Sequence, residues 1–296
     1  MPEEIINHQP RERAKERACD AAVKNTLKYR AIFKYPMSFF QLQTFLICKK
    51  GFDYEFFKKT VRKLHKKNSI KAKEEKFMLP TLKPLSWDLR AKYSKEHLQR
   101  CEKVFKKLEA IKWIKFLGVT GSVAAFNADK DDDVDIFIIT EKNRLWLTRL
   151  FVVLTLKSLG VYRTEENPNK KICPNILIDE SQLEWDKEKQ NIYVAHEIAM
   201  MHPVINRDNI YFRFLKRNRW INTYLGNFNV NYPEKFANKS KDQSEFVTKL
   251  ESIVRSAQMK YMKKKQTSEV TTNNFIHFNK HDWTPKILTQ FEQKSE

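Results

Sequence analysis

The strongest constraint on the fold of this chain comes from one stretch, LGVTGSVAAFNADKDDDVDIFIIT. Two of the five glycines in the 296-residue chain, Gly118 and Gly121, lie here, and Ser122 follows the second. Short apolar runs flank this Gly-Ser turn, one at Trp113–Val119 and one at Val134–Ile139. The pattern predicts a strand, a tight turn at Gly121 and Ser122 (the glycine corner), a helix start and a second strand. The chain should therefore be built around a sheet.

Two aspartates open the second of these strands, with ten residues between Ser122 and Asp133. Asp133 and Asp135 are two positions apart on an extended segment, so their side chains share one face and their Cα atoms lie about 7 Å apart. Such like-charged neighbours favour a compensating cation, and their oxygens suit Mg²⁺ or Mn²⁺. A solvated acidic turn would explain Asp129–Asp132, but it explains Asp135 poorly because that residue lies inside an apolar run.

This combination resembles the nucleotidyltransferases of the DNA polymerase beta superfamily. Their fingerprint is a Gly-Ser at a helix start, followed about a dozen residues later by an apolar-flanked Asp-x-Asp. The resemblance covers roughly residues 84–190. It implies that Gly121 and Ser122 hold the triphosphate of an NTP, and that Asp133 and Asp135 bind Mg²⁺ or Mn²⁺. An acceptor hydroxyl would attack the α-phosphate and release pyrophosphate.

The family usually completes its site with a third carboxylate on a later strand, which helps to deprotonate the attacking hydroxyl. The resemblance assigns this catalytic and metal-binding role to Asp179, which ends the apolar run Asn175–Asp179. Because Glu180 and Ser181 follow, Asp179 is equally explained as a turn residue. Glu197 is the substitute if Asp179 is not the third acid. A site with only two carboxylates would weaken the expectation of strand elongation and of activity.

Cations and aromatic rings near the Asp-x-Asp strand are the remaining candidates for nucleotide contacts. Arg149, on the predicted helix Asn143–Leu159, is the candidate cation for the triphosphate, although a helix-surface cation is slightly favoured. Trp146 and Trp220 would stack on a base or pack in the core, and the core is favoured for both. The histidines show no metal-ligand spacing such as HExxH, so no metal is assigned to them.

Residues 25–82 are predicted to form a winged-helix-like domain behind a basic arm of residues 1–24. Helices are expected over Arg11–Tyr29, over Phe39–Cys48 with Ser38 as its cap, and from an Asp53 cap to Lys67, and two short strands within Ser69–Leu79. A winged helix would place its second helix along a nucleic-acid groove.

The rest of the chain is expected to divide into two parts, which makes the predicted fold class α+β. A polymerase-beta-like nucleotidyltransferase domain, with a mixed sheet and helices, would occupy residues 83–190. A helical region with a basic tail would follow over residues 191–296. Ile172–Ile178 is predicted to be an edge strand because Pro174 has no N–H to donate, and Lys263–Phe278 is predicted to be a polar loop.

Basic charge is concentrated at the two ends of the chain. The formal net charge is +20, divided as +14 over residues 1–110, −1 over residues 111–190 and +7 over residues 191–296. Such a regional excess favours a polyanionic partner, and nucleic acid, RNA or tRNA above all, is the expected acceptor. The alternatives are a transferase that modifies a protein or small molecule, and a catalytically inactive winged-helix regulator.

Cysteine usage and hydropathy predict the compartment. Cys19, Cys48, Cys101 and Cys173 are scattered and form no CxxC pair, which argues for a reducing cytosol and against zinc or disulfides. No apolar run approaches the roughly 18 residues of a membrane span. The first ten residues contain no hydrophobic signal region. We therefore expect a cytoplasmic protein with no membrane partner.

Overall fold

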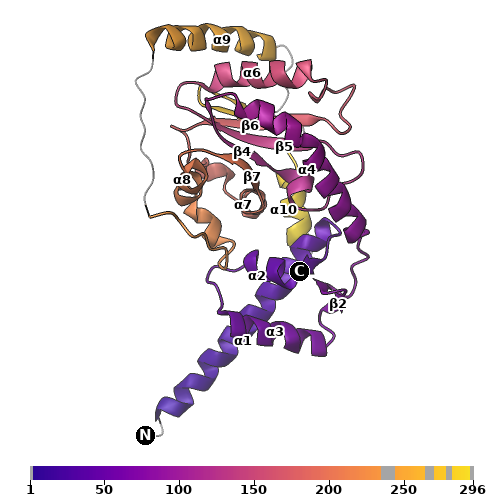
Figure 1. Ribbon diagram of the computed structural model, residues 1–296. Helices are drawn as coiled ribbons and strands as arrows, with labels where there is room; N and C mark the ends of the chain where they lie inside the picture. The colour runs from indigo at the N-terminus through magenta and orange to yellow at the C-terminus, as the bar shows by residue number, and fades with distance from the viewer. Residues whose placement is uncertain (1–2, 235–243, 264–269, 278–281, 294–296) are drawn as a thin grey trace.

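The computed structural model describes residues 3–234, 244–263, 270–277 and 282–293. The chain is α+β, with a small N-terminal sheet and a larger mixed sheet covered by helices (Figure 1). Within the described ranges, none of the helices combines the length and apolar character needed to cross a membrane.

The N-terminal unit follows the predicted order of helix, two short helices and a hairpin. Its elements are α1 (Glu3–Ile32), β1 (Met37–Ser38), α2 (Phe39–Thr44), α3 (Tyr54–Lys66), β2 (Lys71–Lys73) and β3 (Lys76–Met78). The three strands pair in the order β1-β3-β2. Both predicted N-caps are confirmed, because the Ser38 side chain accepts a hydrogen bond from the Gln41 N–H and the Asp53 side chain accepts one from the Phe56 N–H.

A single helix, α1, runs through residue 24, where the sequence placed a boundary between an arm and a domain. The boundary is wrong because the helix contributes core residues on both sides of it. Cys19 and Val23 are fully buried, and Leu27 continues the same apolar stripe against α2 and α3. The N-terminal unit therefore includes much of the segment predicted to be an arm.

The larger sheet contains six strands in the order β7-β4-β5-β6-β9-β8. Only the β5–β6 pair is parallel among the described pairings of this sheet. The strands are β4 (Ile114–Val119), β5 (Val134–Thr140), β6 (Ile172–Asp179), β7 (His202–Asn206), β8 (Val270–Thr271) and β9 (Phe275–His277). The helices are α4 (Trp87–Glu109), α5 (Gly121–Ala124), α6 (Leu145–Ser158), α7 (Ile192–Ala199), α8 (Ile210–Arg217), α9 (Glu245–Lys263) and α10 (Thr284–Gln293), and the 3₁₀ turns are Lys187–Lys189 and Arg219–Thr223.

Two expectations about this sheet are corrected. The strand β6 is internal, between β5 and β9, and it tolerates Pro174 because the β5–β6 register shifts by one residue directly after the proline. The region after residue 190 is not purely helical, since it supplies three of the six strands. Two of them, Val270–Thr271 and Phe275–His277, lie inside the predicted polar loop; residues 264–269 and 278 of that loop lie outside the described residues.

The two faces of the sheet carry different helices. The helices α4, α6 and α9 pack on one face, while α7 and α8 lie on the other (Figure 1). Side chains of β5 alternate between these layers: Ile136 and Ile138 belong to the first core, and Phe137 and Ile139 to the second. Asp135 therefore shares its face with Phe137, on the side covered by α7.

The N-terminal unit is attached to the second layer by direct backbone contact. Cys48 forms a β-bridge with Leu225, and a Cβ on Gly51 would lie 2.6 Å from the carbonyl oxygen of Gly226. Only glycine permits that approach. A second attachment joins the helices, because the ring of Tyr29 on α1 stacks on that of His196 on α7, with 4.2 Å between their centroids.

Candidate functional site

The glycine corner and the Asp-x-Asp strand meet as the sequence predicts. The Thr120 N–H donates to the Asp135 carbonyl at 2.9 Å, which fixes the end of β4 beside the start of β5. Gly121 then adopts a φ of +67°, and a Cβ at this position would lie 3.0 Å from Asp135 Oδ2. Glycine is required here both for the left-handed backbone and for the close approach of the carboxylate.

Ser122 is in the same corner, but its hydroxyl already has a partner. The Ser122 Oγ donates to Asp132 Oδ2 at 2.8 Å, and the same oxygen accepts from the Asp129 N–H at 2.9 Å. The acidic turn before β5 thus has a structural role through Asp132, which goes beyond the solvated turn considered from the sequence. Ser122 lines a cavity on the side of α1, next to Gly121.

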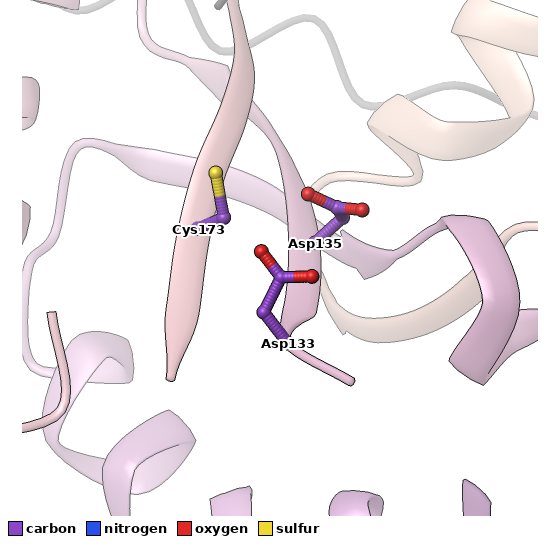
Figure 2. A group of neighbouring side chains, drawn as sticks. All are labelled: Asp133, Asp135 and Cys173. Atoms are coloured by element: carbon purple, nitrogen blue, oxygen red, sulfur yellow. The ribbon is translucent and has the colours of Figure 1, made fainter. Parts of the chain in front are cut away.

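The two aspartates of β5 lie together with a cysteine from the neighbouring strand (Figure 2). Asp135 is the register partner of Cys173 on β6, and one donor atom from each of Asp133, Asp135 and Cys173 lies within 4.8 Å of the others. Arg163, in the segment between α6 and β6, places its Nε 2.5 Å from Asp133 Oδ2. This arginine partly compensates the charge of the pair.

Burial and mutual repulsion act strongly on these groups. Burial, with additional repulsion from Asp133 and Glu197, raises the pKa of Asp135 to about 7. Burial also raises the pKa of Asp133, although the Arg163 charge opposes the change. The pKa of the Cys173 thiol is raised by burial and by both aspartates, and this thiol hydrogen-bonds to Asp135. The site therefore holds more negative charge than its own side chains neutralise.

A third carboxylate reaches the corner from α7. The Glu197 side chain accepts a hydrogen bond from the Gly121 N–H, and burial raises its pKa to about 7. Glu197 lines the same cavity as both aspartates. The substitute considered from the sequence is thus the acid that the fold brings to the site.

Asp179 is not brought to the site, and its assignment as the third carboxylate is wrong. It ends β6 beside Thr140, whereas Cys173 stands opposite Asp135 near the start of the strand, six residues or about 20 Å away. Its carboxylate accepts hydrogen bonds from the Asn143 N–H at 2.6 Å, the Ser181 N–H at 2.7 Å and the Ser181 hydroxyl at 2.5 Å. Asp179 is 1% exposed and acts as the turn residue of the alternative interpretation.

Arg149 is also placed away from the corner, because it belongs to the opposite face of the sheet. Its guanidinium hydrogen-bonds to Gln258 on α9 and is 9% exposed, so the expected contact with a triphosphate is not formed by this residue. Trp146, on the same helix, is buried in the core of that face. Trp220 packs against the core of the other face, as the core interpretation predicts.

Two cavities meet at Gly121 and Glu197. The first, of about 280 Å³, is lined by both aspartates, Cys173 and the aromatic rings Tyr193, Trp185, His277 and Trp283. The second, of about 420 Å³, extends from the corner toward α1 and α10, where Arg30 and Lys286 line it. Carboxylates, cations and aromatic surfaces thus surround one space, which suits a charged ligand with a planar ring. A third cavity, about 660 Å³ between Glu180 and the arginines of α8, is remote from the aspartates.

Sequence reasoning missed Arg163, Cys173 and Arg30. None belongs to the Gly-Ser or Asp-x-Asp motif, and each comes from a different part of the chain. A signal did exist for Cys173: if β6 runs parallel to β5, the start of β6 must lie beside the start of β5. Arg30 and Arg163 carried no comparable signal among the many basic residues.

In comparisons with known proteins, no family model, no curated protein and no solved structure matches this chain.

The donor set fits a divalent cation, with one departure from the Mg²⁺ expectation. Asp133 and Asp135 offer carboxylate oxygens from one strand face. The place beside them on the next strand holds the Cys173 thiol in place of an oxygen ligand. Mg²⁺ prefers oxygen ligands in an octahedral arrangement, so this third position does not suit it.

Proposed function

We propose that the protein is a metal-dependent nucleotidyltransferase that moves an NMP from an NTP to a hydroxyl of a nucleic acid, with RNA or tRNA as the favoured acceptor. The observation that carries the proposal is the close approach of Gly121 to Asp135 in a cavity that both aspartates line. A lone Gly-Ser turn or a lone Asp-x-Asp is common, but their meeting in one cavity is a specific arrangement. The polymerase-beta-like catalytic fold is part of this proposal.

The proposed reaction is an in-line displacement. The acceptor O–H gives its proton to a site carboxylate, its oxygen forms a bond to the α-phosphorus, and the bond to the pyrophosphate oxygen breaks. Glu197 is suited to accept the proton because its pKa of about 7 leaves a basic fraction near neutral pH. The Gly121 N–H holds that carboxylate in the corner.

Asp133 and Asp135 would hold the divalent cation. When bound, it supplies positive charge to the phosphate oxygens. The side chains of this chain contribute binding around it: Arg30 and Lys286 line the adjoining cavity and would attract the rest of the triphosphate. The rings of Tyr193 and Trp283, which line both cavities, offer surfaces for a base.

The N-terminal unit would bind the nucleic acid, in the role of a winged helix. Lys59, Arg62 and Lys66 are exposed at positions that share one face of α3. The opposite face of α3 is occupied by the core, and Lys63 pairs with Glu16 of α1 at 3.0 Å. A basic stripe on a firmly packed helix is suited to phosphate contacts. We place this activity in the cytoplasm, where the four free cysteines would stay reduced.

The decisive experiment is label transfer. The protein is incubated with total RNA, Mg²⁺ or Mn²⁺, and each NTP labelled at the α-phosphate, beside Asp133→Asn/Asp135→Asn and an Asp131→Asn control. We expect labelled RNA from the wild type and the control, and none from the double variant. Label on a protein would instead support a transferase that modifies proteins. The absence of label with every NTP and both metals would contradict the transferase.

A second candidate is a nucleic-acid-binding regulator whose site no longer transfers nucleotides. The ion pair between Arg163 and Asp133 favours it, because a resident guanidinium takes the place of part of the metal's charge. Under this hypothesis RNA binds with no transfer of label in any condition. Both hypotheses predict that RNA affinity falls as the salt concentration rises. Replacing Lys59, Arg62 and Lys66 together by glutamine should reduce the slope of log affinity against log salt concentration by about two to three.

A further inference from the structure

We propose that the site binds a transition-metal cation such as Mn²⁺, Co²⁺ or Zn²⁺ through Asp133, Asp135 and the thiolate of Cys173, in preference to Mg²⁺. This inference rests on the proposed function only for the use that the metal serves. The binding itself follows from the three side chains.

The first argument is geometric. The parallel register places Cys173 opposite Asp135, and the donor atoms of the three residues lie within 4.8 Å of one another (Figure 2). Ligand atoms around one ion at bond lengths of about 2.0 to 2.3 Å are separated by about 3 to 4 Å, so a small inward rotation of these side chains completes the set. All three line the 280 Å³ cavity.

A second observation at the same place is independent of the acidic pair. The Asn175 side-chain oxygen is buried and has no hydrogen-bond donor among the described residues, and Asn175 lines the same cavity. Asn175 is the extra residue of the register shift between β5 and β6. Such a bulge redirects a side chain, and an unsatisfied buried oxygen is costly unless a ligand or its water meets it. An ion with a bound water would provide that partner.

The chemistry of sulfur selects the ion. Thiolates bind borderline metals such as Zn²⁺ and Co²⁺ far better than Mg²⁺, which takes oxygen ligands. On binding, the Cys173 S–H bond breaks, its electron pair forms the bond to the metal, and the proton leaves to solvent, so no oxidant or reductant is needed. Arg163 must release Asp133, and its side chain is 39% exposed, which leaves it room to rotate into water.

This arrangement also changes how the cysteines are interpreted. The sequence argued against a zinc site because no two cysteines are close together. The sheet instead brings one cysteine to two carboxylates, a combination that no cysteine spacing could indicate.

The test measures metal binding without nucleotide. Co²⁺ is titrated into the full-length protein while the thiolate-to-cobalt charge-transfer band is recorded, and Zn²⁺, Mn²⁺ and Mg²⁺ then compete. Variants are Cys173→Ser, Cys173→Asp and, as a half-buried cysteine elsewhere, Cys48→Ser. We expect the band in the wild type and in Cys48→Ser, its loss in Cys173→Ser with affinity weakened about tenfold or more, and a shift toward Mg²⁺ in Cys173→Asp.

A second variant keeps the proposal testable if Cys173 substitutions destabilise the fold. Arg163→Gln frees Asp133, so it should strengthen Co²⁺ binding in the wild-type background and leave the band in place. A wild-type protein with no thiolate band, or one that binds Mg²⁺ as tightly as Mn²⁺, would overturn the inference. Neither result depends on label transfer, so the metal assignment and the transferase proposal fail separately.

Discussion

The two ends of the parallel β5–β6 pair carry aspartates in opposite circumstances. At the start of the strands, Asp133 and Asp135 face each other and a thiol at a cavity, with raised pKa values. At the far end, Asp179 is buried against two backbone N–H groups and a hydroxyl. The first end has more negative charge than its surroundings compensate, and the second has its hydrogen bonds satisfied.

The comparison shows that the donors around a carboxylate decide between a structural and a ligand-binding role. Asp135 and Asp179 are the same residue type and both lie near the end of a strand, with Asp179 the more completely buried of the two. Hydrogen-bond donors stabilise the charge of a carboxylate inside a protein, whereas a second carboxylate destabilises it. A carboxylate pair without such donors is therefore an arrangement suited to binding a cation.

The largest expected effect is on activity, at the end of the β5–β6 pair that carries Asp133 and Asp135. Asp135→Asn should lower the rate of nucleotide transfer by about 100- to 1,000-fold while leaving the free energy of unfolding unchanged or slightly increased. The amide keeps the shape of the side chain and removes a charge that Asp133 repels. Rates from labelled NTP and urea unfolding curves provide the two measurements. A loss of activity that only follows a loss of stability would break the comparison.

The next effect is on stability, at the end of the β5–β6 pair that carries Asp179. Asp179→Asn replaces an acceptor of three hydrogen bonds by an amide that cannot accept all of them, so the free energy of unfolding should fall by about 3 kcal/mol. Urea unfolding followed by tryptophan fluorescence measures it. A change below about 1 kcal/mol would show that this carboxylate is no more structural than Asp135.

A smaller effect is the pH dependence of the metal-free protein. The folded pKa of Asp135, about 7, exceeds its ordinary value of 3.8, so between these values the folded state binds more protons than the unfolded chain. The contribution of Asp135 to stability is present below pH 4, decreases as the pH rises to about 7, and is absent above. We expect a loss on the order of 2 kcal/mol over this range.

That loss should be reduced in Asp135→Asn and in the presence of a saturating divalent cation. Thermal unfolding of the wild type and the variant in a series of buffers tests both statements. Equal slopes for the two proteins would contradict the raised pKa.

The smallest effect is expected for an acid outside both ends. Asp131 is exposed and pairs with Lys170 at 3.1 Å. Asp131→Asn should change stability by less than about 0.5 kcal/mol and leave transfer unaffected, because exposed ion pairs contribute little. A large effect on either measurement would extend the site beyond Asp133.

The sequence was sufficient where a feature is local. The Gly121 corner, the Asp-x-Asp strand, and the caps at Ser38 and Asp53 are each encoded within a few residues, and all are found where they were predicted. Local propensity also predicted the N-terminal helices and the helix Leu145–Ser158. These features depend on backbone geometry and on near neighbours, which one sequence records directly.

The sequence was insufficient where strand direction and distant pairing decide. Asp179 was chosen because it ends an apolar strand, yet the parallel direction of β6 carries it to the wrong end. Glu197 reaches the corner through the packing of α7, which has no local signature. The strand Phe275–His277 is too short to be recognised before its partner Ile176–Ile178 is known.

The helix α1 connects the two halves of the proposed machinery as one rigid rod. Its earlier turns, around Cys19, are embedded in the core that carries α3, and Tyr29 stacks on the helix that carries Glu197. About 15 Å of continuous helix separates those two contacts. A strand of RNA held on α3 would thus meet the corner at a constant offset, so the number of bases between the gripped segment and the modified end would be set by the protein rather than by the substrate.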